Sequence, residues 1–201
     1  MIDQLSIVNA CLATMGEAPL NTLEEDHSFK AAAMQKIERS HLDVSGKAYW
    51  FNTEWVKASP QSDSKYVMIP QDVIAVEARS RCGRYHVAQR GTRLYDVARN
   101  RYEFDSPVTI LVRRHLDYDL LPFEAQAYIR DNAVVLFQSD FDADRAKLQI
   151  LVELRRDSLV RLNSEDIRQK RINLLARQSV RDLLVDSMPA HPWHPHQTFP
   201  G

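Results

Sequence analysis

The chain has few of the features that mark secreted, membrane-spanning or disulfide-bonded proteins. Only two cysteines, Cys11 and Cys82, occur among the 201 residues, and neither stands in a C-x-x-C pair. We therefore expect free, buried thiols made in a reducing compartment. No apolar run approaches the roughly 20 residues that a membrane-spanning helix needs. The first residues lack a basic segment followed by an apolar core, so no secretory signal is expected.

Sequence motifs of common active sites are missing as well. The five glycines are spread singly along the chain, so there is no glycine-rich phosphate loop. Neither G-x-S-x-G nor H-E-x-x-H occurs. Acidic pairs are abundant, but a sequence cannot test the separation of roughly 5–9 Å that glycoside hydrolysis requires. We expect no catalytic residue and no cofactor.

The composition, with 44% hydrophobic and 26% charged residues, is that of an ordinary globular protein. The net charge is -1, but the charges are unevenly distributed. Residues 1–45 hold seven acidic and three basic side chains, whereas residues 79–101 hold seven arginines and one acid. This asymmetry suits nucleic-acid binding. It also suits a ring in which the basic face of one subunit meets the acidic face of the next, and the near-zero total favours the ring.

The first twenty residues predict a helix followed by a tight turn. Apolar residues recur at steps of three and four over residues 5–15, and Asp3 stands where an N-cap is expected. Gly16 suits a left-handed C-cap, and Pro19 prevents continuation of the helix. Asn9 lies inside this helix, and because a buried amide needs partners, we expect it to hold the following turn.

A second helix is predicted over about residues 28–47, with Asp26 or Ser28 as its cap. The aromatic residues 49–51 follow directly and are expected in the core. A polar connection is then predicted over residues 55–63.

The central part of the chain predicts a small antiparallel sheet, because short β-branched and aromatic runs alternate there with turn signals. The sequence Arg90-Gly91-Thr92-Arg93 is typical of a hairpin tip. The predicted strands are Tyr66–Ile69, Val73–Val76, Tyr85–Gln89, Leu94–Val97 and Val108–Val112.

Two further helices are predicted after the sheet. The third begins at Pro122 and runs to about Gln138, and the fourth is capped by Asp140 or Asp142. Residues 164–185 predict either a fifth helix or an extended arm. The last fifteen residues contain four prolines, which prevent a helix and favour extended chain. This tail is a candidate docking peptide because of its aromatic residues, Trp193 and Phe199.

Two sets of residues have the composition of metal ligands. His115, Asp117 and Asp119 alternate and would share one face of a strand, although a solvated strand end explains the same pattern. Three histidines of the tail lack the preformed support that metal ligands need, and we predict no metal site. These histidines are His191, His194 and His196.

Taken in order, these motifs resemble the tail tubular protein A family, the head-to-tail adaptors of short-tailed bacteriophages. The resemblance rests on the helix with its G-E-x-P turn and T-L-E exit over residues 5–24, and on the aromatic segment ending at Asn52. It also includes the glycine followed by L-Y-D at residues 91–96 and the L-P that precedes the third helix. Tyr49 departs from the family, where glycine is common at this place.

The resemblance spans roughly residues 1–175 and implies an α+β fold. Expected are a bundle of about four helices with a small inserted antiparallel β-sheet and an extended C-terminal arm. The expected parts are the N-terminal helices (1–54), the antiparallel β region (55–120), the C-terminal helices (121–163), and the C-terminal arm with its proline-rich tail (164–201).

The resemblance further implies a structural protein of the virion tail, made in the host cytoplasm and without membrane contact. Such a protein forms a dodecameric ring that joins the portal to the nozzle protein of the tubular B type. Double-stranded DNA passes through the ring without sequence recognition. The residues expected to bind the portal are Trp193, Phe199, Asn173 and Leu175; those expected to face the nozzle are Arg90, Gly91 and Tyr95; and those expected between subunits are Arg79, Arg81, Arg84 and Arg93.

Two other functions remain open from the sequence. One is a tail-associated hydrolase of polysaccharide or peptidoglycan, which no set of residues supports. The other is a nucleic-acid-binding module, because arginine stands beside tyrosine at Arg84-Tyr85 and Arg101-Tyr102, as in platforms for single strands.

Overall fold

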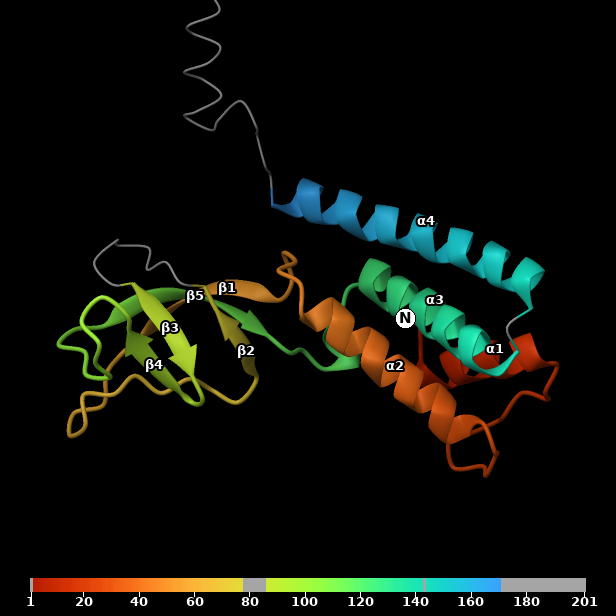
Figure 1. The fold of residues 1–201 in the computed structure, drawn as a ribbon, viewed down its shortest axis with the longest axis horizontal. Coiled ribbons are helices and arrows are strands. Elements are labelled where there is room, and N and C mark those ends of the chain that lie inside the picture. The colour runs from red at the N-terminus through yellow and green to blue at the C-terminus, as the bar shows by residue number, and fades with distance from the viewer. Residues whose placement is uncertain (1, 78–85, 143, 171–201) are drawn as a thin grey trace, which may run out of the picture. The chain divides into compact units, whose positions relative to one another are not determined.

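The computed structural model describes residues 2–77, 86–142 and 144–170, in which α-helices precede and follow a set of antiparallel strands along the chain (Figure 1). This arrangement confirms the predicted α+β class. The helices are α1 (Gln4–Met15), α2 (Lys30–Ser45), α3 (Phe123–Phe141) and α4 (Arg145–Gln169), with a short 3-10 helix, η1 (Tyr118–Leu120), before α3. The strands are β1 (Thr53–Ala58), β2 (Val73–Val76), β3 (Val87–Arg90), β4 (Arg93–Asp96) and β5 (Val108–Arg114).

Helix α1 and its turn form as the sequence predicts. The Asp3 carboxylate accepts a hydrogen bond from the Ser6 backbone N–H at 2.7 Å, and Gly16 ends the helix with a φ of 76°, a conformation that glycine adopts without strain. The Asn9 side chain donates to the Leu20 carbonyl at 2.9 Å and accepts from the Leu20 N–H at 2.8 Å. The prediction that Asn9 holds the turn is confirmed.

The start of α2 differs from the prediction. The N-cap position is Phe29, which makes no side-chain capping bond, so the predicted caps at Asp26 and Ser28 are wrong. Packing fixes this end, since the Phe29 ring lies against the C-terminal half of α3. The Lys30 ammonium also donates to the Glu25 carbonyl at 2.6 Å, which closes the preceding loop.

Helices α2 and α4 both pack on α3, which is buried along much of its length. A polar chain crosses the bundle at its centre. The Asn132 side-chain amide of α3 donates to the Ser40 hydroxyl of α2 at 3.1 Å, and Arg155 of α4 donates to the Asn132 side-chain oxygen at 3.4 Å. Because Ser40 and Asn132 are buried, each needs such a partner.

The connection between α3 and α4 lies further along the chain than predicted. Helix α3 continues to Phe141, and Asp144 caps α4 by accepting from the Ala146 N–H at 2.9 Å. The predicted caps are wrong because both are engaged elsewhere: Asp140 pairs with Lys36 of α2, and Asp142 accepts from Gln138 at 2.6 Å.

Helix α4 runs without a break through Ser164 to Gln169. The predicted change to a new helix or an arm after Asn163 is therefore wrong as far as Gln169. Beyond the expected boundary Glu165 is 9% exposed, and the Asp166 carboxylate accepts from the Trp50 N–H at 2.8 Å, so packing continues across it. The rest of the expected arm lies outside the described residues. No helix within the described ranges is long and apolar enough to cross a membrane.

The strands form a three-stranded antiparallel sheet, ordered β1-β5-β2, and a separate β3-β4 hairpin. Strand β1 lies where a polar connection was predicted, and that prediction is wrong. Its residues Val56 and Ala58 pack on the sheet core, whereas Glu54, Trp55 and Lys57 are exposed. The charged residues Glu54 and Lys57 masked the strand. Residues 66–69 form isolated bridges rather than the predicted strand.

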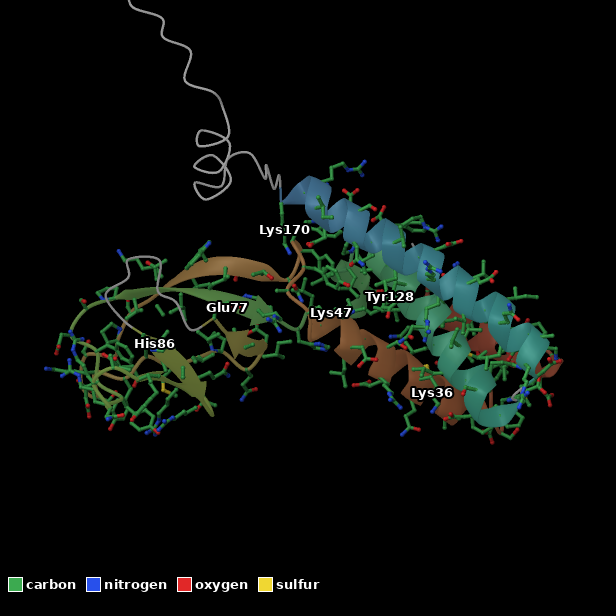
Figure 2. The ribbon with its side chains drawn as sticks, turned by 45° about the horizontal axis from the view of Figure 1, so that its top comes forward. Lys36, Lys47, Glu77, His86, Tyr128 and Lys170 are labelled. Atoms are coloured by element: carbon green, nitrogen blue, oxygen red, sulfur yellow. The ribbon has the colours of Figure 1, made fainter. Side chains whose placement is uncertain are left out.

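Asn52 shapes the chain between α2 and the sheet. Its side chain donates to the carbonyls of Ser45 at 3.2 Å and Lys47 at 3.0 Å, and it accepts from the Tyr49 N–H at 2.9 Å. Its own carbonyl accepts from the Arg114 N–H of β5 at 2.8 Å. Figure 2 labels Lys47 at this turn. The side chain of Asn52 thus holds the turn that contains the aromatic segment, and its backbone carbonyl connects this turn to the sheet.

Candidate assembly surfaces

The β3-β4 hairpin ends in a tight turn that presents arginines. Gly91 is the first residue of the two-residue turn and has a φ of 61°, as type II′ hairpins require. The Leu94 N–H donates to the Val67 carbonyl at 3.0 Å, and the Ile69 N–H donates to the Thr92 carbonyl at 2.9 Å. These bonds fix the hairpin on the segment before β2.

Arginine and tyrosine side chains cover one side of this hairpin. The Arg90 guanidinium lies 3.5 Å from the centroid of the Tyr95 ring, and Arg93 lies 4.8 Å from that of Tyr66. The Tyr102 ring meets Tyr95 edge-on, with 4.9 Å between centroids. We call Tyr66, Arg90, Arg93, Tyr95 and Tyr102 the tyrosine–arginine surface. Stacked cations and rings of this kind suit contact with another protein.

The residues expected at this surface differ in their exposure to solvent. Arg90 and Gly91 are exposed, whereas Tyr95 is only 7% exposed beneath its neighbours. A partner would therefore meet Arg90 directly and Tyr95 mainly through it. Arg93 is exposed as well. Three of the expected inter-subunit residues lie outside the described residues: Arg79, Arg81 and Arg84.

The loop after β4 is organised by a buried carboxylate. Asp96 is fully buried and accepts from the N–H groups of Ala98 and Arg99 at 3.1 and 3.2 Å. The Arg99 guanidinium lies 3.3 Å from the same carboxylate. These bonds satisfy the buried charge locally, which gives the single acid of the basic segment a structural role.

Two histidines meet where α2 approaches the end of β5. The rings of His41 and His115 lie 4.6 Å apart between centroids, and His115 Nδ1 is 3.0 Å from the Ser45 hydroxyl. Burial lowers the pKa of His41, and the neighbouring His115 adds to the effect. In the part of the chain that the structure describes, no group of three or more His, Cys, Asp or Glu side chains could hold a metal ion.

An apolar groove of about 410 Å³ opens between α1, α3 and α4. Leu154 in its wall is 51% exposed. The sequence analysis did not predict this groove. Ile150 and Leu154 are apolar and four residues apart on α4, and this spacing could have indicated a second apolar strip on the helix. We call the space the helical groove; it is lined by Ala10, Ala13, Thr14, Arg130, Asp131, Val134, Leu151 and Leu154.

The four residues expected to bind the portal lie outside the described residues: Asn173, Leu175, Trp193 and Phe199. Cys82 and the tail histidines lie outside them too. Cys11 is fully buried and makes no disulfide, and this burial raises the pKa of its thiol to about 12. The expectation of a buried free thiol is confirmed for Cys11.

Comparison with known proteins gives two findings. A family described as tail tubular protein matches residues 5–182, which include all the described helices and strands except the first residue of α1. The chain is also similar to the tail tubular protein A of Klebsiella phage KP34, with 25% identity over 126 residues. That match covers 63% of this chain and 66% of the relative, which is just under two thirds of the relative's length.

Proposed function

The chain belongs to the tail tubular protein family, a family of structural proteins of bacteriophage tails, and from this premise we propose that it is a head-to-tail adaptor. In this role twelve copies form a ring beneath the portal. The ring is joined below to the nozzle protein, and the genome leaves the head through its centre.

The observation that carries the proposal is the extent of the family match. It runs from residue 5 to residue 182, so it includes the bundle and the β region rather than one widespread element. An assembly role also accords with the exposed features described above. They are a tyrosine–arginine surface on the hairpin and an apolar groove on the helices, which suit protein contacts.

Separate parts of the chain serve separate partners in this proposal. The hairpin tip, with Arg90, Gly91 and Tyr95, faces the nozzle. The C-terminal residues reach the portal, through Trp193 and Phe199 in the tail and Asn173 and Leu175 before it. Side chains that can fill pockets, such as tryptophan, are frequent anchors of protein interfaces.

The ring also restricts where the arginines of residues 79–101 can lie. A channel must let DNA slide, and each neutralised phosphate adds salt-dependent affinity. We therefore place these arginines mainly off the channel wall, with Arg79, Arg81, Arg84 and Arg93 at contacts between subunits. The net charge of -1 fits such a balance.

The test is the mass of the purified protein, alone and mixed with its portal protein, by native mass spectrometry. One chain has a mass of 23.2 kDa, so twelve copies would add about 278 kDa to the portal complex. A complex heavier by this amount supports the adaptor role even if the free protein is a monomer. A protein that leaves the mass of the portal unchanged contradicts it.

A further inference from the structure

We propose that Arg90 and Arg93 hold a carboxylate of the nozzle protein between their two guanidinium groups, so that the partner segment at this contact is acidic. This inference rests on the nozzle contact proposed above for the hairpin, and it names the chemistry that the contact recognises. Because Arg93 stands opposite Arg90, it also brings Arg93 into the nozzle contact. Arg79, Arg81 and Arg84 are then left for the contacts between subunits.

The two arginines face each other across the hairpin. In the register of β3 and β4, Arg90 pairs with Arg93, and both residues are exposed. The side chains of residues paired in this way lie on the same face of the strands, with Cβ atoms roughly 5 Å apart. Like charges at such positions repel each other. An anion between the two guanidinium groups removes this repulsion and binds to both.

Tyrosine rings hold both guanidinium groups against the hairpin. Arg90 lies 3.5 Å from the centroid of the Tyr95 ring, and Arg93 lies 4.8 Å from that of Tyr66. The Tyr95 hydroxyl donates to the Asn100 side chain at 3.0 Å, which fixes the ring beneath Arg90. A guanidinium group that stacks on a ring by its face can still donate from its edge. Because these side chains are already ordered, they lose less conformational entropy when a partner binds.

Within the described residues no carboxylate pairs with these two arginines, whereas the arginines that follow β4 have acidic partners. Arg99 lies 3.3 Å from the buried carboxylate of Asp96, and Arg101 lies 2.8 Å from that of Asp105. The hydrogen bond to Asp105 raises the pKa of Arg101, and the charge of Glu103 adds to this effect. The acids of this loop therefore act on other arginines, which leaves the pair at the hairpin tip for an acid from outside the chain.

The surroundings of the two arginines fit a protein better than DNA. Met68 forms an isolated bridge with Arg93 and is 43% exposed. Methionine, tyrosine and arginine are enriched in protein interfaces, whereas a phosphate backbone has no apolar group to bury a methionine. Affinity for DNA grows with the number of neutralised phosphates, and a single pair of arginines neutralises few of them. A protein carboxylate is therefore the anion that this face fits.

Removal of each charge tests the site in the full-length protein. Arg90→Gln and Arg93→Gln should each raise the Kd for the purified nozzle protein roughly tenfold. The double variant should lose less than the product of the two single losses, because both arginines hold the same carboxylate. Lys57→Gln is the matched control: it removes one exposed positive charge from β1 and should leave the Kd unchanged. All four variants should unfold at the temperature of the parent.

A cross-link identifies the carboxylate itself. In Arg90→Lys and Arg93→Lys the introduced amine keeps the positive charge, and a carbodiimide joins an amine to a neighbouring carboxylate as an amide, with loss of water. Peptide mass spectrometry of the treated complex should then show position 90 or 93 joined to an aspartate or glutamate of the nozzle protein. Lys57 is present in the same sample as an internal control and should not be joined to the nozzle protein.

The outcomes separate this inference from the adaptor role. Glutamine variants that bind the nozzle protein as tightly as the parent overturn the inference and leave the adaptor role intact. A link from position 90 or 93 to a second copy of this chain overturns it too, since the arginines then lie between subunits. Variants that lose retention of double-stranded DNA, and keep the nozzle protein, would make the anion a phosphate and overturn it as well. If the wild-type protein adds its mass to the portal but binds no nozzle protein, the nozzle contact fails and the inference fails with it.

Discussion

Asn9 and Leu20 are joined by two hydrogen bonds, one in each direction, across eleven residues of sequence. Leu20 lies outside the helices and strands, so the Asn9 side-chain amide takes the place of the backbone partners that its N–H and carbonyl would otherwise need. Leu20 is 7% exposed, so water replaces these bonds poorly. The turn after α1 depends on a single side chain within the helix.

We expect Asn9→Ala to destabilise the fold by about 2 kcal/mol, because it leaves the Leu20 N–H and carbonyl without partners. Asn9→Asp should also destabilise the fold, since it keeps the acceptor for the Leu20 N–H but sets a carboxylate oxygen against the Leu20 carbonyl. Urea unfolding followed by circular dichroism measures both. Asn21→Ala, at an exposed position next to the turn, is the control and should stay within about 0.5 kcal/mol of the parent. An Asn9→Ala protein as stable as this control would contradict the role of the hydrogen bonds between Asn9 and Leu20.

Asn52 makes a second prediction, for the junction between α2 and the sheet. Asn52→Leu removes two donated bonds and two accepted bonds at a position that is 3% exposed. The expected loss is about 3 kcal/mol, because buried backbone groups are left unpaired. Thermal unfolding checks the size of the effect. Thr53→Val is a nearby control, because it removes one hydrogen bond to Asn52 and leaves the bonds of Asn52 to the backbone. Its loss of stability should be smaller. A loss as large as that of Asn52→Leu would mean that disturbed packing, rather than the bonds of Asn52, destabilises the junction.

His41 should make stability depend on pH. Burial and the adjacent His115 lower its pKa in the folded protein below the ordinary value, although Glu38, Asp117 and a hydrogen bond to the Leu116 carbonyl act in the other direction. The unfolded chain then binds more protons, so stability is complete above pH 6.5 and falls as the pH drops towards the folded pKa. Urea midpoints at pH 7.5 and 5.5 should differ for the parent.

The His41→Gln variant should lose part of this difference, because glutamine does not titrate. An equal change with pH in parent and variant would assign the effect to other groups. The tilted stacking of His41 on His115 at 4.6 Å makes His115→Gln a useful companion. That change should raise the pKa of His41, which nuclear magnetic resonance of the imidazole can follow directly.

The hairpin tip gives a prediction about partners. Arg90→Glu should weaken binding to the nozzle protein at least tenfold, because it reverses an exposed charge and removes the cation over Tyr95. Binding to the portal should not change. Arg39→Glu on α2, also exposed, is the charge-matched control. Pull-down with each partner separates the two results, and equal loss of both partners would contradict a nozzle-specific role.

Local signals in the sequence predicted those elements whose causes are local. Asp3, Asn9 and Gly16 each act within about a dozen residues, and the structure has all three in their expected roles. Strand β1 was missed because it is defined by pairing with β5, fifty to sixty residues later. The helical groove was missed for the same reason, since it exists only where three helices meet.

Capping shows how packing overrides a local preference. Four acidic or hydroxyl residues had suitable positions before α2 and α4, yet Phe29 begins one helix and Asp144 the other. The Phe29 ring is held by aromatic contacts with α3. Asp140 binds Lys36, which is distant in sequence, and Asp142 binds Gln138 on the preceding helix. Such competition between partners is set by the tertiary fold.

Deletion of residues 187–201 tests the division of roles along the chain. In the proposed function this tail binds the portal, so the truncated protein should unfold at the same temperature as the parent but add no mass to the portal. Trp193→Ala combined with Phe199→Ala should reproduce most of the loss, because aromatic anchors carry much of an interface's energy. Replacing His191 and His194 with alanine is the matched control and should retain binding. A truncated protein that is insoluble or less stable would make the tail part of the fold, and one that still binds the portal would move the contact elsewhere.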